Sequence, residues 1–238
     1  MSFEIRERDL LARIGQLETK SGAVETPILL PVVNPAIQPI SPKTMRDEFG
    51  CVALMTNAYI IKNHSESKAT EIGIHRLLDF DGVIMTDSGA YQILVYGDVG
   101  TTNREIIQFQ EKINADIATI LDMPTGWGVS EQYARHTVEE TLKRAKELAK
   151  VKSRSDILWT GPVQGGIYLN WVAQSSKAMS KLPFQIHALG SPTPVMEQYL
   201  FHTLVDMIMT TKLNLPPDRP LPVSYTHLRA HVTVLDLV

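Results

Sequence analysis

Two carboxylates stand where apolar runs of the sequence end. Asp87 closes the run that begins at Gly82, and Asp122 closes the run that begins at Asp116. A carboxylate in such a place can serve as general acid or base, as nucleophile, or as acceptor for the N–H groups of a ligand. Beside an anomeric carbon it can assist the cleavage of a glycosidic bond, which passes through an oxocarbenium-like state. Glycosyl transfer or hydrolysis by a carboxylate pair is therefore open to this sequence.

Amide and glycine residues follow two further apolar runs. Gln164 and Gly165 end one of them, and Gly190 ends the other. Glycine allows the backbone N–H groups around it to approach a ligand closely. Tyr91 adds an aromatic ring that could stack on a flat base. On the residues alone, ordinary turns and a core aromatic explain these features equally well.

Six apolar runs end in Asn, Asp, Gln, Thr or Gly and predict buried strands. Continuous apolar runs of this kind are typical of parallel strands covered on both faces. The six runs are residues 27–34, 51–59, 82–87, 116–125, 156–166 and 184–191.

Segments with helical periodicity and recognisable starts lie between these runs. Ser41 precedes a proline and Ser130 precedes an amphipathic segment, so both predict N-caps, as does Asn103 before REIIQFQEKI. Thr193 with the next proline predicts a helix that reaches about Lys212. One apolar stripe is expected on the long helix after Ser130, formed by Val138, Leu142, Ala145 and Leu148.

Alternating strands and helices predict a parallel α/β fold, in its barrel form the (β/α)8 TIM barrel, whose active sites lie at the carboxyl ends of the strands. The interval from Pro27 to Phe184 holds five units of about 31 residues each. Eight units would need about 250 residues. We therefore expect a TIM barrel truncated after about six to seven strands, the seventh near Arg219 to Val223, within a longer enzyme.

The composition is that of an ordinary globular protein, with 44% hydrophobic and 21% charged residues and a formal net charge of -3. No apolar run is long enough for a membrane span, and the N-terminus is too charged for a secretory signal, so a cytoplasmic location is expected. Cys51 is the single cysteine, and the seven histidines lack ligand spacing, so no metal site is expected in this chain. A basic cluster is interpreted as a solvated helix face interleaved with Glu139, Glu140 and Glu147; its members are Lys143, Arg144, Lys146, Lys150, Lys152 and Arg154.

Four ordered motifs carry a family resemblance: TDSGAYQ, ILDMPT, PVQGG and HALG. Together they resemble the tRNA-guanine transglycosylase family. The segments ETPILLPVVNP, MTNAYIIK, EIGIHRLLDFDG and YGDVGTTNREIIQFQ are similar to its archaeal branch, which replaces guanine at position 15 of tRNA with 7-cyano-7-deazaguanine in archaeosine formation. The resemblance implies that residues 1–223 are an incomplete TIM-barrel catalytic domain of a pentosyltransferase.

The resemblance also implies roles for individual residues. Asp87 is expected to be catalytic, as acid or base, with the nucleophile as an open alternative because the family's second Asp follows an eighth strand beyond this chain. Asp122 is expected to bind the purine. Further substrate contacts are expected from Ser88, Tyr91, Gln92, Gln164, Gly165, Gly190 and Ser191. Ser191 departs from the second glycine of the family pattern.

The implied partners are tRNA, guanine and 7-cyano-7-deazaguanine, with no membrane, and a homodimer for the full-length protein. The family's zinc is held by residues absent here, so this chain is expected to need no cofactor. Residues 224–238 break the family pattern and are interpreted as a non-native tail. The alternative function is a non-catalytic subunit or module that binds tRNA or the base.

Overall fold

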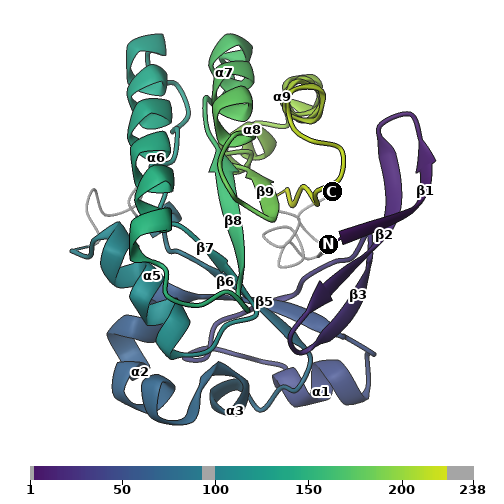
Figure 1. Cartoon of the computed structure of the whole chain (residues 1–238), viewed down its shortest axis with the longest axis vertical. Helices are drawn as coiled ribbons and strands as arrows, with labels where there is room; N and C mark the ends of the chain where they lie inside the picture. Colours follow the sequence, from purple (N-terminus) through teal and green to yellow (C-terminus); the bar gives the residue numbers. More distant parts are fainter. Residues whose placement is uncertain (1–2, 93–99, 224–238) are drawn as a thin grey trace, which may run out of the picture.

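The computed structural model describes residues 3–92 and 100–223 and contains two sheets (Figure 1). The first is antiparallel, with the order β1-β2-β3. The second is parallel, with the order β4-β5-β6-β7-β8-β9. The strands are β1 (Phe3–Asp9), β2 (Ala12–Thr19), β3 (Gly22–Thr26), β4 (Val32–Val33), β5 (Ala53–Asn57), β6 (Val83–Asp87), β7 (Ile117–Thr119), β8 (Leu158–Val163) and β9 (Ile186–Leu189).

Helices follow the parallel strands and form the outer layer of the molecule (Figure 1). They are α1 (Pro42–Asp47), α2 (Ala58–Ile72), α3 (Ile74–Leu78), α5 (Asn103–Lys112), α6 (Glu131–Val151), α7 (Leu169–Met179), α8 (Thr193–Glu197) and α9 (Phe201–Asn214). The strands follow one another in chain order, each hydrogen-bonded to the next. This is the arrangement of the first six units of a (β/α)8 barrel, and it confirms the predicted fold class.

The expected seventh strand begins beside β9. The backbone N–H of His187 donates to Pro220 O at 3.1 Å, and that of Leu189 donates to Pro222 O at 3.0 Å. Leu189 and Val223 form a parallel bridge. The interpreted tail, residues 224–238, lies outside the described residues.

The sequence analysis did not predict the antiparallel sheet. Its strands are rich in charged residues, and most of their side chains are exposed or half-buried. The buried apolar side chains are Phe3, Leu17 and Val24. These three pack against Val83 and Ile117 at the amino ends of the parallel strands. The sheet therefore covers the end of the barrel opposite to the carboxyl ends of its strands.

The helix caps explain where the helices begin. The Thr44 N–H donates to Ser41 Oγ at 3.0 Å, and Ser130 caps α6 in the same way, as predicted. The predicted cap at Asn103 was wrong, because Thr102 caps α5 in a capping box with Glu105.

One predicted helix is broken into two. The segment from Thr193 ends at Glu197, and α9 begins at Phe201. Between them Tyr199 has φ +58°, which no α-helix accommodates. The prediction of a continuous helix to about Lys212 was therefore wrong.

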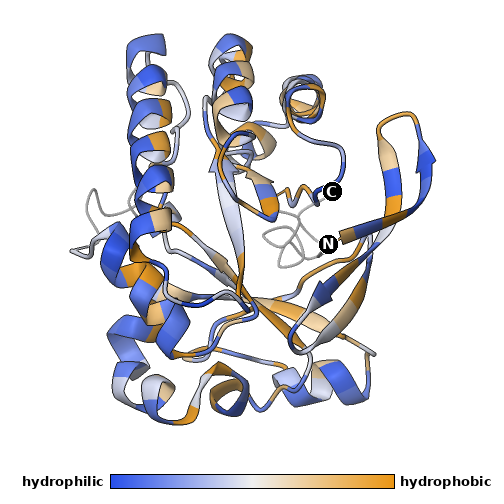
Figure 2. Cartoon of the chain, viewed as in Figure 1, coloured by the Kyte–Doolittle hydropathy of each residue, from blue (hydrophilic) through white to orange (hydrophobic). Residues whose placement is uncertain are grey.

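The core lies between the parallel sheet and the helices. Apolar colour is strong on β5 and β6 in Figure 2, whereas α6 is largely hydrophilic on its outward side. On α6 the predicted stripe is confirmed. Val138, Ala145 and Leu148 are buried, and Leu142 packs against the core cluster that contains Ala145 and Leu148. The amphipathic helices thus hold the strands, and with them the strand ends, in a fixed frame.

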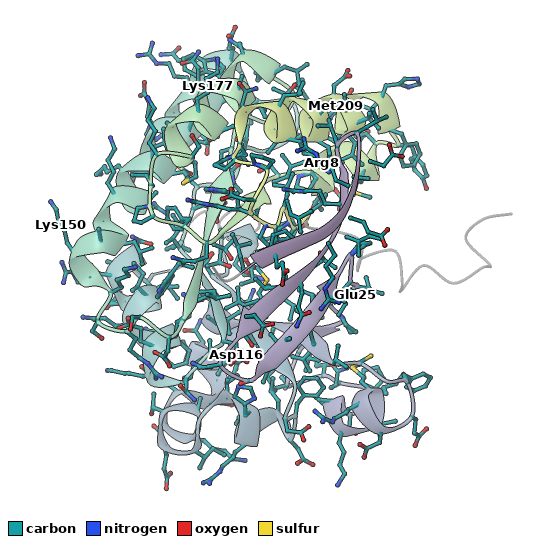
Figure 3. The ribbon with its side chains drawn as sticks, turned by 45° about the vertical axis from the view of Figure 1, so that its right-hand side comes forward. Arg8, Glu25, Asp116, Lys150, Lys177 and Met209 are labelled. Atoms are coloured by element: carbon teal, nitrogen blue, oxygen red, sulfur yellow. The ribbon has the colours of Figure 1, made fainter. Side chains whose placement is uncertain are left out.

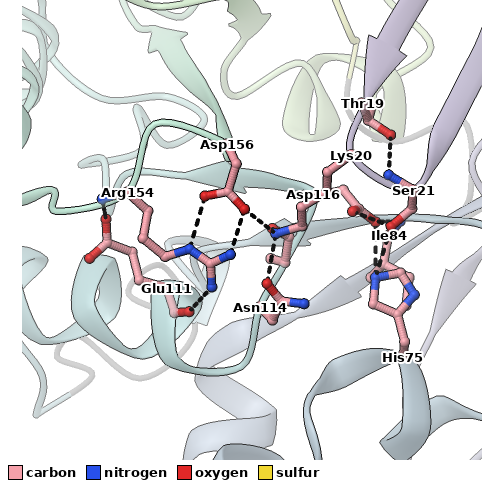
Figure 4. A network of polar contacts seen from close by, with 11 residues as sticks. Thr19, Lys20, Ser21, His75, Ile84, Glu111, Asn114, Asp116, Arg154 and Asp156 are labelled. Carbon is pink, nitrogen blue, oxygen red and sulfur yellow. Dashed lines mark hydrogen bonds and ion pairs between the residues drawn. The ribbon is translucent and has the colours of Figure 1, made fainter.

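Asp116 is the centre of a polar network at the amino ends of β6 and β7 (Figures 3 and 4). Its carboxylate is fully buried, accepts hydrogen bonds from Ser21 Oγ at 2.6 Å and Ile84 N at 2.8 Å, and lies 3.1 Å from His75 Nε2. Lys20 Nζ donates to Ala115 O at 2.6 Å. These contacts attach the turn between β2 and β3 to the amino ends of β6 and β7.

The network predicts a pH-dependent contribution of His75 to stability. Burial lowers the pKa of His75, but the hydrogen bond and charge of Asp116 outweigh it, so the pKa is raised above 6.5. The stabilisation of the fold by protonated His75 is therefore complete below pH 6.5 and is lost as the pH rises through the folded-state pKa of His75. We expect His75→Gln to cost about 1 kcal/mol at pH 5.5, as for one hydrogen bond, and less at pH 8.5.

Urea unfolding of the wild type and His75→Gln at both pH values measures this difference. His64→Gln is the matched control, because His64 is exposed. A cost of His75→Gln that grew with pH would contradict the prediction.

Candidate active site

Four neighbouring parallel strands end in the residues that the sequence analysis selected. Asp87 is the last residue of β6, Gln164 follows β8 and Gly190 follows β9. Asp122 lies three residues beyond Thr119, the last residue of β7. The structure thus brings the four segments to one edge of the sheet, where barrel enzymes have their active sites.

Asp122 is a buried carboxylate with an unusual ionisation. Its exposed fraction is 7%, and it accepts a hydrogen bond from Gln164 Nε2. Burial, followed by the charge of Asp87, raises the pKa of Asp122 to about 7, against the opposing effects of Gln164 and Arg144. Asp122 is therefore poised to change its charge near neutral pH.

Asp87 is the second acid of the site. Burial raises the pKa of Asp87, while the backbone N–H groups of Ser88 and Gly89 lower it. Gly89 has φ +92°, and a Cβ there would lie 3.1 Å from Tyr59 Cγ, so the turn requires glycine. The turn aims two N–H groups at the carboxylate, and two interacting acids with raised pKa values are typical of acid–base sites.

Gln164 is held through both ends of its amide. Its Oε1 accepts from Ser191 Oγ at 2.9 Å and from Thr125 N at 3.0 Å, and Thr125 Oγ1 lies 3.2 Å away. Its Nε2 donates to Asp122. An amide nitrogen carries two protons, and Nε2 has one partner among the described residues, so one N–H remains for a ligand, whereas the oxygen is already engaged. Toward a ligand, Gln164 acts as a donor.

Glycines make room for this amide. A Cβ on Gly190 would lie 2.8 Å from Gln164 Cδ, so a larger residue there would displace the side chain. Gly165 has φ +136°, and its N–H already donates to Thr125 Oγ1 at 3.2 Å. Gly165 therefore shapes the loop, and its N–H is engaged within the protein.

The remaining predicted contacts differ in their surroundings. Ser88 is fully buried, and its Oγ has no partner among the described residues. Gln92 Oε1 accepts from Asn57 Nδ2 at 3.2 Å, and Asn57 is the register partner of Asp87. Tyr91 is 41% exposed. Ser191 directs its hydroxyl toward Gln164, which explains how a serine fits beside Gly190.

Sequence reasoning missed two residues of the site. Thr125, in the loop after β7, is buried and touches Gln164, Gly165 and Ser191. Arg144 was assigned to a solvated helix face, but its Nη1 donates to Asp122 O at 3.1 Å and to Leu121 O at 3.2 Å. For Arg144 that interpretation was wrong, because the long side chain crosses from α6 to the strand end. Arg144 has no sequence signal that separates it from its neighbours, whereas Thr125 ends both the apolar run 116–125 and the motif ILDMPT.

Within residues 3–92 and 100–223, no group of three or more His, Cys, Asp or Glu side chains could hold a metal ion. In the same part of the chain, none of the helices has the length and apolarity needed to cross a membrane.

Comparison with known proteins gives the family. A family model described as queuine tRNA-ribosyltransferase matches residues 9–224. The chain belongs to this family. It is similar to proteins named tRNA-guanine(15) transglycosylase. The one from Methanosarcina mazei is 46% identical over 220 residues, which are 92% of this chain and 44% of that protein.

Two further relatives carry the same name. The protein from Pyrobaculum aerophilum is 43% identical over 222 residues, 93% of this chain and 44% of that protein. The protein from Thermococcus onnurineus is 42% identical over 220 residues, 92% of this chain and 37% of that protein. The chain thus spans about two fifths of the length of the curated relatives it matches.

Proposed function

We propose that this chain is part of an enzyme that exchanges guanine at position 15 of tRNA for 7-cyano-7-deazaguanine. The observation that carries the proposal is the pairing of Asp122 with Gln164 at one strand edge. Asp122 provides acceptors, and Gln164 provides one free N–H beside them. A 2-amino-6-oxopurine such as guanine presents the complementary set, an N1–H between an exocyclic amine and a carbonyl oxygen.

This pairing supports selection of the base. An ionised Asp122 accepts from the N1–H and the exocyclic amine, and Gln164 donates to the carbonyl oxygen. A base without these groups would leave a buried carboxylate unpaired, which is the costly way to bind a wrong ligand. Asp122 and Gln164 therefore favour guanine and 7-cyano-7-deazaguanine over adenine.

Asp87 supports the chemical step. Base exchange breaks the bond between the ribose anomeric carbon and the base nitrogen, and the departing base must gain a proton there. The raised pKa of Asp87 makes it a suitable proton donor to the leaving base and acceptor from the incoming one. Direct attack of Asp87 on the anomeric carbon is the alternative role.

The proposal extends to partners and cofactors. We infer that tRNA is the macromolecular substrate, that the full-length protein is a cytoplasmic homodimer, and that its zinc is held outside the described residues. The described side chains provide no cluster of three ligands for zinc, and the proposed base exchange does not depend on zinc in this part of the chain. Exchange of labelled guanine into tRNA distinguishes an enzyme from a module that only binds the base.

The test of the proposed pocket is Asp122→Ala. We expect this change to weaken binding of 7-cyano-7-deazaguanine by about 2 to 4 kcal/mol, because charge-assisted hydrogen bonds are lost. Calorimetric titration of the wild type and the variant measures the effect. Asp47→Ala is the matched control, since Asp47 is exposed on α1. An unchanged dissociation constant for Asp122→Ala would contradict the assignment.

A further inference from the structure

Two hydroxyl groups, of Ser191 and Thr125, lie at the oxygen end of the Gln164 amide, and a third, of Thr137, is joined to them through Thr125. Ser191 Oγ donates to Gln164 Oε1 at 2.9 Å and accepts from Thr125 N at 2.8 Å. Thr125 Oγ1 lies 3.2 Å from Gln164 Oε1 and 2.7 Å from Thr137 Oγ1. Both threonines are at most 1% exposed, so protein groups and not bulk water decide where these protons point.

The number of protons available decides which of these hydroxyl groups donates and which accepts. Thr137 Oγ1 donates to Ala134 O at 2.8 Å, so its single proton is used in its own helix. Thr137 is then an acceptor for the proton of Thr125 Oγ1. The hydroxyl of Ser191 has no other acceptor among the described residues and donates to Gln164 Oε1. Ser191 O–H therefore donates to the amide oxygen, and the Thr125 N–H is shared between that oxygen and Ser191 Oγ.

We propose that Ser191 and Thr125, supported by Thr137, are positioning residues that fix which end of the Gln164 amide faces Asp122. The inference rests on the proposed function and deepens it. By holding the amide oxygen away from the pocket, these residues make Gln164 a donor toward the base. The preference for a carbonyl oxygen over an amino group at this position of the base follows from the Ser191 hydroxyl and the Thr125 N–H, which both donate to Gln164 Oε1.

The reversed amide shows what the positioning prevents. Turned over, Gln164 would place its oxygen against the Asp122 carboxylate and its NH₂ group against the Thr125 N–H. Both contacts would be repulsive, and Gln164 could then accept from an amino group on the base. Without the Ser191 hydroxyl, one of the fixed donors that oppose this reversal is lost.

The backbone conformation of Ser191 indicates that its hydroxyl has a role beyond the turn. Ser191 has φ +57°, a conformation that glycine adopts more readily than any residue with a Cβ. A residue needed only for the turn would therefore be served at least as well by glycine. The serine adds the hydroxyl that reaches Gln164.

The experiment compares Ser191→Ala and Ser191→Gly in the whole chain, with Ser180→Ala as the matched control. Ser180 ends α7, and its Oγ donates to Lys177 O at 2.9 Å, away from the pocket. Calorimetric titration with guanine and with 2,6-diaminopurine gives a carbonyl-to-amino preference for each variant. We expect both Ser191 variants to lower this preference by roughly tenfold, the value of about one hydrogen bond. Ser180→Ala should leave it unchanged.

A second readout needs no ligand. NMR titration of the Asp122 carboxyl carbon and of the Gln164 side-chain amide follows the contact between the two residues. In both Ser191 variants we expect the Asp122 pKa to rise, because Gln164 donates to the carboxylate for less of the time, and we expect the two Gln164 amide protons to become more alike.

The two readouts separate the inference from the proposed function. If the wild type bound neither base, the proposed function would fail, and the Asp122 titration would still test the positioning. The inference is overturned if Ser191→Gly keeps both the wild-type base preference and the wild-type Asp122 titration. It is equally overturned if Ser191→Ala alone shows the change, since that would assign the effect to the backbone.

Discussion

Asp122→Asn is expected to stabilise the folded chain at pH 8 by about 2 to 4 kcal/mol, although it removes a carboxylate from the proposed base pocket. Burial and the charge of Asp87 raise the pKa of Asp122 from 3.8 to about 7. Ionising Asp122 therefore costs more in the folded state than in the unfolded state. Asparagine has nearly the same shape and no charge, and its Oδ1 can still accept from Gln164.

The pH dependence has a definite sign. A carboxyl group whose folded-state pKa is raised carries no penalty below pH 3.8, and stability is lost as the pH rises from there to about 7. The advantage of Asp122→Asn should therefore be small at pH 4 and complete at pH 8. Urea unfolding at the two pH values measures it.

Asp156→Asn provides a control of opposite sign. Its side chain is 44% exposed, and its hydrogen bond with Arg154 lowers the pKa of Asp156 to about 2. Replacing this carboxylate should slightly destabilise the chain at pH 8. Equal effects of Asp122→Asn at pH 4 and pH 8 would mean that the charge of Asp122 is not the cause.

Asp116→Ala is expected to destabilise the chain by about 3 to 5 kcal/mol, the usual cost of removing one partner of a buried ion pair. Asp116 is fully buried and is contacted by Ser21, His75 and the Ile84 N–H. Alanine would leave all three without this acceptor. Because a domain is stable by only about 5 to 15 kcal/mol, much of the margin would be lost.

Asp116→Asn separates the lost charge from the lost shape. The asparagine Oδ1 can still accept from Ile84 N or Ser21 Oγ. We therefore expect the free energy of unfolding of Asp116→Asn to lie between that of the wild type and that of Asp116→Ala. Thermal and urea unfolding give the comparison. A cost below about 1 kcal/mol for Asp116→Ala would show that water replaces the carboxylate and that the network is not a tight one.

The sequence predicted the parallel strands and the residues at their carboxyl ends better than the antiparallel sheet. Asp87, Asp122 and Gln164 could be found because each follows a continuous apolar run, and in a parallel sheet the ends of such runs meet at one edge. The strands near the amino terminus gave no such signal. In FEIRERD only Phe3 is buried, so the pattern resembles a charged surface segment.

Other differences arose where two local explanations competed. Thr102 and Asn103 are both good capping residues, and Glu105 three residues after Thr102 decided in favour of Thr102. Arg144 could not have been chosen, because its role depends on a contact made across the fold. Thr125 ends the apolar run 116–125, but its contact with Gln164 also depends on the fold. Arg144 meets Asp122 O from a different element, 22 positions along the chain.

The contacts of the turn between β2 and β3 also set an order of events during synthesis. Lys20 bonds Ala115 and Ser21 bonds Asp116, and in each pair the residues are 95 positions apart. A ribosome that adds about 5 to 20 residues per second needs on the order of 5 to 20 s to make that interval. Throughout that time the hairpin of β2 and β3 lacks its partners Ala115 and Asp116. The hairpin is made first and docks late, after the chain has passed β7.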